Sequence, residues 1–192
     1  MTTASITALL YTDSEAADAA LRAIALELLE RGVALAGLVQ HNQPRPGRSR
    51  CDMVLEDLAT SELLPISQDR GPHARGCALD YGQLAVAIEM VSSALHSAPA
   101  LVILNKFGKS EGEGGGFRPV IAEAVERAIP MLIAVPFRNL ESWRTFTGDF
   151  AREYVLDALP HDGAGLCSAL GLDGIEPASN VRLTPPHAAL RD

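Results

Sequence analysis

The sequence has 192 residues, of which 47% are hydrophobic and 21% charged, and a formal net charge of −8. This composition excludes a disordered chain, a collagen-like chain and a disulfide-rich miniprotein, and the acidic balance argues against nucleic acid as a partner. No apolar run approaches the roughly 18 to 20 residues that span a bilayer, and no basic segment precedes the first apolar run, so we expect a cytoplasmic protein without a membrane segment.

The N-terminal part of the chain predicts a βαβ unit. The apolar run 6–11 (ITALLY) is typical of a buried strand, and leucines and alanines then recur at helical spacing over 15–31. Asp13 or Ser14 is the expected N-cap of this helix, and Gly32 its stop signal. The run 33–40 (VALAGLVQ) predicts the second buried strand.

The middle of the chain interrupts this alternation. Two prolines and three arginines over 41–50 predict a basic loop, and 52–67 predicts a β-hairpin with its turn near 57–62. The glycine- and proline-containing stretch that follows is expected to be a loop, after which Asp80 can cap a helix that runs to about Ser97.

The next segments return to alternating strands and helices. Strands are expected over 100–105 and 131–136, with a helix over 118–128 between them and a short helix with Leu140, Trp143 and Phe146 turned inward after them. The sequence patterns that predict strands and helices weaken from about residue 151. We therefore expect one α/β domain over residues 1–170, with an insert at about 41–79, and an extended tail over 171–192.

The fold class that this order predicts is α/β, a three-layer parallel sheet with helices on both faces and a small β-hairpin insert. We also expect the strands 6–11 and 100–105 to be neighbours, because phosphate-binding folds place their two ligand-bearing strands together. Cys51, Cys77 and Cys167 form an odd set without a CxxC pair and are expected to be reduced thiols.

A candidate anion site follows the strand 100–105. Lys106 and Lys109 are the only lysines of the chain, and they lie between Asn105 and the glycines Gly114, Gly115 and Gly116. Arg118 opens the next helix, so cationic groups and exposed backbone amides are expected to converge on an anion. Glu111 and Glu113 add negative charge to the same loop, and a solvated flexible loop remains the alternative.

The loop after the first strand lacks the signature of nucleotide hydrolysis. A phosphate-binding loop of the GxxxxGK[ST] type needs glycine and lysine directly after the strand, and this place reads YTDSEAADAALR. Ser14 could still donate a hydrogen bond from the start of the helix, but so short a polar loop cannot surround a triphosphate. Conventional Walker-type hydrolysis is therefore not expected.

A second cluster of cationic residues lies in ISQDRGPHARGC, residues 66–77. Arg70, His73 and Arg75 suit an oxyanion or a carboxylate, and the alternative is that Asp69 pairs with one of the arginines.

Two motifs carry a family resemblance. SQDRGPHARGC and NKFGKxExxGxG, the latter formed by Asn105, Lys106, Phe107, Gly108, Lys109, Glu111, Gly114 and Gly116, resemble a bacterial domain family of unknown function that is often encoded beside molybdate-transport genes. The resemblance runs over 6–148 and implies similarity to P-loop nucleoside-triphosphatases of the thermophilic-enzyme type, here with a degenerate Walker A position. It transfers no established activity.

Three functions remain open from the sequence. The first is a binding protein for a small oxyanion, with molybdate the named candidate, or for the phosphates of a nucleotide, held by Lys106, Lys109 and Arg118 with Arg70 and Arg75. The second is an unconventional phosphohydrolase or phosphotransferase that binds Mg²⁺ through Asp13, Glu111 or Glu113. The third is a non-catalytic adaptor that forms a homodimer.

Overall fold

The computed structural model describes residues 6–44, 51–68 and 78–177. Its centre is a seven-stranded sheet in the order β4-β3-β2-β7-β8-β1-β9, and β5 and β6 form a separate two-stranded sheet. The strands of the large sheet are β1 (Ile6–Tyr11), β2 (Leu35–Pro44), β3 (Cys51–Asp57), β4 (Leu63–Pro65), β7 (Leu101–Leu104), β8 (Met131–Pro136) and β9 (Ala151–Val155). The small sheet pairs β5 (Ser67–Gln68) with β6 (Ala78–Leu79).

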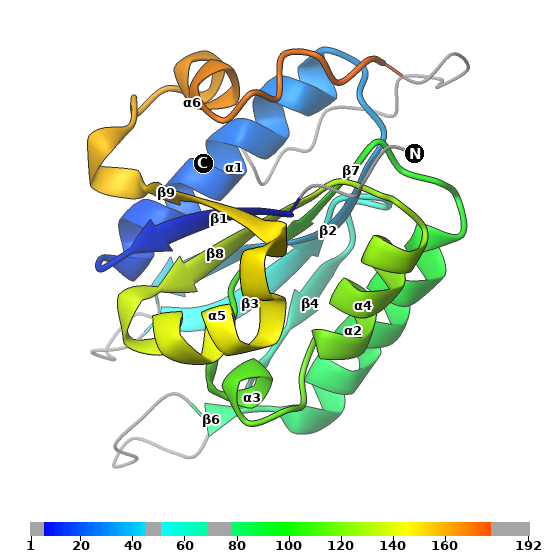
Figure 1. Ribbon diagram of the computed structural model, residues 1–192. Helices are drawn as coiled ribbons and strands as arrows, with labels where there is room; N and C mark the ends of the chain where they lie inside the picture. The colour runs from blue at the N-terminus through cyan, green and yellow to red at the C-terminus, as the bar shows by residue number, and fades with distance from the viewer. Residues whose placement is uncertain (1–5, 45–50, 69–77, 178–192) are drawn as a thin grey trace.

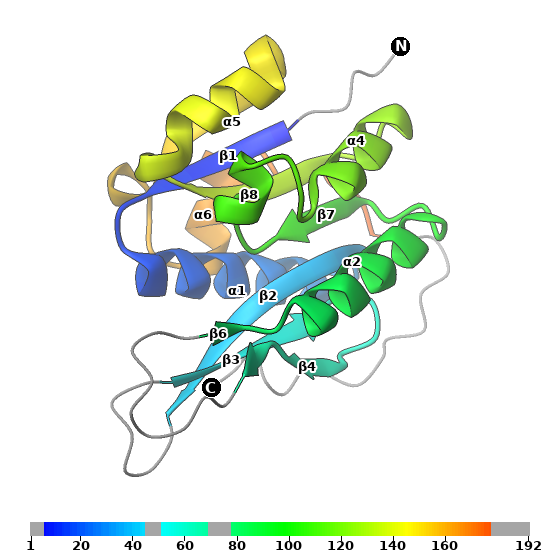
Figure 2. The same ribbon diagram turned by 90° about the horizontal axis from the view of Figure 1, so that it is seen from below.

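Helices cover both faces of the sheet, as the sequence predicted (Figures 1 and 2). One face carries α1 (Ser14–Glu30) and α6 (Gly163–Ala169), and the other carries α2 (Tyr81–Leu95), α4 (Arg118–Glu126) and α5 (Leu140–Thr147). The remaining helical segments are α3 (Lys109–Gly112), η1 (Phe137–Asn139), η2 (Gly148–Phe150) and η3 (Leu156–Ala158). The α/β three-layer fold is therefore confirmed.

Each face of the sheet has its own apolar core. The core under α1 and α6 contains Leu21, Leu28 and Ile103, and the core under α2, α4 and α5 contains Val91, Leu104 and Trp143. Leu101 to Leu104 are buried throughout, because alternate side chains of a central parallel strand enter the two cores. This arrangement explains why continuous apolar runs, and not alternating ones, marked the strands in the sequence.

The expected contact between the strands 6–11 and 100–105 is wrong. β8 lies between β1 and β7 and pairs in parallel with both, with Met131 opposite Ile6 on one side and Val102 on the other. A six-residue strand that is buried throughout needs neighbours along both edges. The order along the chain did not reveal this, because β1 connects to distant β2 through α1.

The predicted hairpin exists but is not separate from the sheet. β3 and β4 are antiparallel, and β3 also pairs with β2 over a register from Leu38 opposite Asp57 to Pro44 opposite Cys51. Residues 41–44 therefore continue β2, where a loop was expected. The sequence also missed β5, β6, β9 and α6, which are short or partly exposed.

Gly37 marks the point where β2 changes partners. Residues 35–37 pair with β7, and residues 38–44 pair with β3. Gly37 has φ +108°, and a Cβ there would lie 1.9 Å from the carbonyl oxygen of Ile103. The glycine permits this close approach. The pairing of β2 with β7 ends at this glycine.

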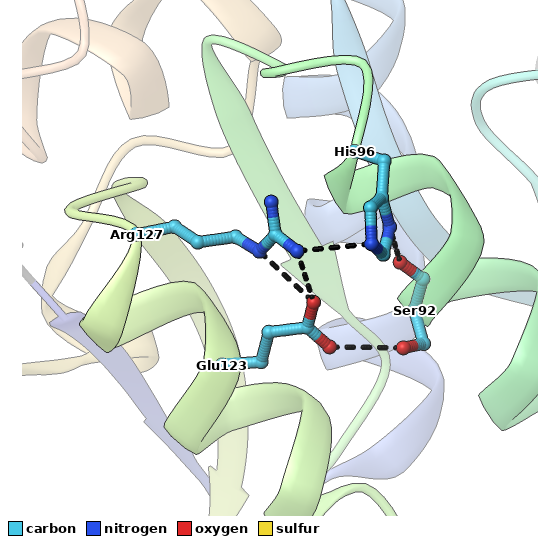
Figure 3. A network of polar contacts seen from close by, with 4 residues as sticks. All are labelled: Ser92, His96, Glu123 and Arg127. Carbon is cyan, nitrogen blue, oxygen red and sulfur yellow. Dashed lines mark hydrogen bonds and ion pairs between the residues drawn. The ribbon is translucent and has the colours of Figure 1, made fainter.

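A polar network joins α2 and α4 on the outer surface (Figure 3). The Ser92 hydroxyl donates to Glu123 Oε2 at 2.9 Å, and Arg127 Nε donates to Glu123 Oε1 at 2.9 Å. His96 Nδ1 lies 3.0 Å from the Ser92 carbonyl oxygen, and its Nε2 lies 3.0 Å from Arg127 Nη2. The imidazole thus carries its proton on Nδ1 and accepts on Nε2.

Candidate functional site

A pocket of about 220 Å³ lies at the carboxyl end of β7, where Leu38 and Gln40 from the middle of β2 also line it. Asn105, Lys106, Lys109 and Ser110 line it from the β7 side, and Gln40 lines it from β2. Most of its wall is apolar, formed by Leu38, Leu55, Ile66, Leu79, Leu84 and Leu104. Ligands of open α/β sheets bind at this edge, so the pocket is the candidate site.

Three residues predicted from sequence meet at this pocket. Asn105, Lys106 and Lys109 all line it. Lys109 is 87% exposed and lies 3.6 Å from Glu113 as an i,i+4 pair, whereas Lys106 is half-buried and acts electrostatically on Asp18. Lys106 therefore sits in the less solvated environment, where a charge interacts more strongly with a ligand.

The glycine loop is organised around the buried carboxylate of Glu111. Glu111 is 5% exposed, and it accepts hydrogen bonds from the Gly108 amide at 2.8 Å and the Phe117 amide at 2.9 Å. A Cβ on Gly116, at φ +58°, would lie 1.8 Å from Glu111 Oε1. Glu111 thus satisfies the amides that the loop would otherwise offer to an anion.

The other loop residues have structural contacts of their own. The Gly114 amide donates to the Glu111 carbonyl and the Gly115 amide to the Ser110 carbonyl. Arg118 donates through Nε to the Glu111 carbonyl, and its guanidinium lies 4.5 Å from the centre of the Phe146 ring. Arg118 therefore packs toward α5, and its charge is held by a cation–π contact.

The turn after β1 is closed by its own side chain. Asp13 Oδ1 accepts from the amides of Glu15 at 2.8 Å and Ala16 at 3.3 Å, and the Asp13 carbonyl accepts from Ala17. Ser14 is exposed, and burial raises the pKa of the neighbouring Tyr11 hydroxyl. The N-terminus of α1 thus already holds a carboxylate.

A relay of polar side chains, which sequence reasoning missed, connects α1 to the pocket, and its members Asp18 and Gln40 are buried. Asp18 accepts from Asn42 Nδ2 at 3.1 Å and contacts Gln40 Nε2 at 3.5 Å, and Asn105 Nδ2 donates to Gln40 Oε1 at 3.0 Å. Burial raises the pKa of Asp18, opposed by the charge of Lys106 and the hydrogen bond from Asn42. One sequence signal was present, because Asp18 interrupts the apolar face formed by Ala17 and Leu21.

The remaining candidates fall into two groups. Arg70, His73, Arg75 and Cys77 lie outside the described residues, and of Cys51 only the backbone is described. Cys167 is a free, buried thiol, as expected, and burial raises its pKa to about 11. Among residues 6–44, 51–68 and 78–177, no cluster of three or more His, Cys, Asp or Glu side chains could hold a metal ion.

The geometry defines an α/β domain with a ligand-sized pocket at the carboxyl edge of a mostly parallel sheet. Within this class, residues 6–160 match the family described as a protein of unknown function, DUF2478, and the chain belongs to that family. Within the described part of the chain, no helix is long and apolar enough to cross a lipid bilayer.

A curated relative shares part of this chain. The molybdenum import ATP-binding protein ModC 2 of Bradyrhizobium diazoefficiens is 36% identical over 143 residues. The match covers 74% of this chain and 16% of the relative, so the chain spans about a sixth of that protein's length. No solved structure matches the chain.

Proposed function

We propose that this domain binds a nucleotide at the carboxyl edge of the sheet, with the phosphates beside Lys106 and Lys109. The observation that carries the proposal is the convergence of Asn105, Lys106 and Lys109 on one pocket together with Gln40. The partial match to an ATP-binding import protein supports a nucleotide ligand. A link to molybdenum metabolism rests on the name of that relative alone.

The contacts favour binding over Walker-type hydrolysis. The turn after β1 has no phosphate-binding loop, and the Asp13 carboxylate already accepts from the first free amides of α1. The acids suggested for Mg²⁺ are also engaged, because Glu111 accepts from two amides and Glu113 pairs with Lys109. We therefore expect binding without Mg²⁺-dependent release of phosphate.

Calorimetric titration of the full chain tests this proposal. The probes are ATP with and without Mg²⁺, inorganic phosphate and molybdate. Lys106→Ala should weaken ATP binding about tenfold to a hundredfold, because one charge-assisted contact in a half-buried site is lost. Lys109→Ala should have a smaller effect, because its ammonium is 87% exposed.

Arg152→Ala is the matched control, since it removes one exposed positive charge from β9 at the far edge of the sheet. It should bind ATP as the wild type does. A folded Lys106→Ala variant with unchanged ATP affinity would contradict the proposal and make Arg70 and Arg75 the next residues to replace. Tight binding of molybdate without binding of ATP would favour the oxyanion function instead.

A further inference from the structure

A groove of about 800 Å³ lies at the amino ends of β2 and β7, at the opposite end of the sheet from the candidate site. Its walls come from the C-terminal end of α1, the start of β2, the turn between β3 and β4, and α2. Most of the lining residues are apolar, among them Leu29, Val33, Leu58, Val86, Met90 and Pro99. An apolar groove of this size at the surface favours the binding of another chain segment.

The described residues that line this groove carry only negative charge. Asp57, Glu62 and Glu89 line it, and no described lysine, arginine or histidine does. Glu62 and Glu89 are exposed, and neither forms an ion pair with another described residue. The groove therefore suits an occupant that has both apolar side chains and positive charge.

The described chain reaches the rim of this groove after α6. Arg31, at the C-terminal end of α1, donates to the carbonyl oxygen of Asp173 at 2.9 Å, and Ile175 packs against the core under α1 and α6. Pro177 then lies next to Gly32, where an added Cβ would lie 3.5 Å from Pro177 Cβ. Figure 1 shows this orange-red part of the chain beside the C-terminal end of α1. The two α1 contacts directly precede the groove wall in the sequence, so the chain arrives at the groove.

The next fifteen residues, 178–192, have the composition that the groove requires. Their sequence is ASNVRLTPPHAALRD, with two arginines and one acidic side chain. Val181 and Leu183 flank Arg182, and in an extended chain alternate side chains point to opposite sides, so the two apolar side chains can face the groove together. Four extended residues span up to about 13 Å, which brings Val181 within reach of the groove from Pro177.

We propose that residues 178–192 bind in this groove of the same chain. Val181 and Leu183 contact its apolar walls, and Arg182 lies beside Glu89. The segment then connects the end of α1 with the turn between β3 and β4 and with α2. This inference is independent of the proposed function, because the groove and the candidate site lie at opposite ends of the sheet.

Tryptic cleavage of the full chain after Arg182 tests this docking. A bound segment is cut only in the molecules that have released it, so the cleavage rate measures the released fraction. The reference is a synthetic peptide of residues 178–192, which has no groove to bind. The full chain should be cut about tenfold or more slowly than the peptide, because burial of two apolar side chains favours the bound state. Equal rates overturn the inference and leave the groove open to a different partner.

Two valine variants locate the protection. Val86 and Val125 are both exposed on helices, at 47% on α2 and 38% on α4, and of the two only Val86 lines the groove. Valine and serine have similar helix propensities, so both variants should fold. Val86→Ser should raise the cleavage rate about threefold to tenfold, because one apolar contact is lost, and Val125→Ser should leave it unchanged. An unchanged rate in Val86→Ser would place the segment elsewhere and overturn the inference.

Charge and oligomeric state complete the test. Glu89→Gln should raise the cleavage rate about twofold to fivefold, as expected for the loss of an exposed ion pair, whereas Glu126→Gln, at an exposed residue of α4, should not. Equal effects of the two variants would contradict the contact of Arg182 with Glu89. Protection that grows with protein concentration, in a chain that sediments as a dimer, would mean that the segment of a second copy fills the groove, and it would overturn binding within one chain.

Discussion

Two loops at the carboxyl edge of the sheet use their polar groups in opposite ways. The turn after β1 is two residues long, and Asp13 closes it by accepting from the first amides of α1. The loop after β7 runs from Asn105 to Phe117 and folds around the buried carboxylate of Glu111. In both loops, a carboxylate accepts hydrogen bonds from backbone amides that could otherwise donate to a phosphate.

The loops differ in what they leave at the surface. At the start of the second loop, Asn105 and Lys106 line a pocket. Asn105 is hydrogen-bonded to Gln40, and the charge of Lys106 acts on Asp18. A glycine-rich loop next to lysines is therefore not by itself evidence of an anion-binding loop. Here the glycines accommodate Glu111, and side chains at the strand end form the candidate site.

The largest expected effect tests the role of Glu111 in the second loop. Gly116→Ala would force a Cβ onto Glu111 Oε1 at a positive φ, so the carboxylate must leave its two amides. We expect a loss of about 3 kcal/mol in unfolding free energy, from backbone strain and unpaired buried groups. Urea denaturation measures this loss.

Gly114→Ala is the matched control for this variant. Its φ is +98°, but a Cβ there would meet no atom within 4 Å, so only the backbone strain of about 1–2 kcal/mol applies. Equal losses of unfolding free energy in the two variants would mean that both glycines are needed only for their positive φ angles. The loop would then not depend on space for the Glu111 carboxylate.

A smaller effect is expected in the first loop. Asp13→Ala removes the N-cap of α1 and should cost about 1 kcal/mol, as is typical of helix caps. Asp80→Ala, which removes the equivalent cap of α2, should cost a similar amount. If Asp13→Ala were as damaging as Gly116→Ala, the two loops would not differ in the way described. Thermal and urea unfolding of both variants provide the measurement.

The pH dependence of stability tests the burial of Asp18. Because burial raises the pKa of this carboxyl, the native state binds its proton more tightly than the unfolded chain does. The unfolding free energy of the wild type should therefore fall, relative to that of Asp18→Asn, as the pH rises above about 4, the usual value for aspartate. A difference that stays flat or grows with pH would show that Asp18 is not desolvated.

The smallest effect is expected far from both loops, in the network between α2 and α4 (Figure 3). The hydrogen bond from Ser92, and then the contact with Arg127, lower the pKa of Glu123. The wild type should therefore be slightly more stable than Glu123→Gln above about pH 4.3, and this advantage should disappear as the pH falls through the pKa of Glu123. Equal stabilities at neutral pH would show that the network contributes nothing.

The sequence by itself determined the layers of this fold and the strand end that bears the candidate site. Apolar runs predicted strands at 6–11, 100–105 and 131–136, and with the amphipathic helices between them they predicted a three-layer α/β domain. The polar residues at the end of the second of these strands marked the edge where a ligand would bind. These features are local, because hydrophobic periodicity and capping residues act within one element.

Only the tertiary structure decided the strand order, the role of each loop residue and the relay. β8 lies between β1 and β7. All three strands are apolar and buried, so the sequence of any one of them does not show which of the others it pairs with. Glu111 organises the loop in this fold because its carboxylate accepts hydrogen bonds from amides three and six residues away. Asp18, Gln40 and Asn105 come from α1, β2 and the end of β7, so their hydrogen bonds exist only once these elements pack together.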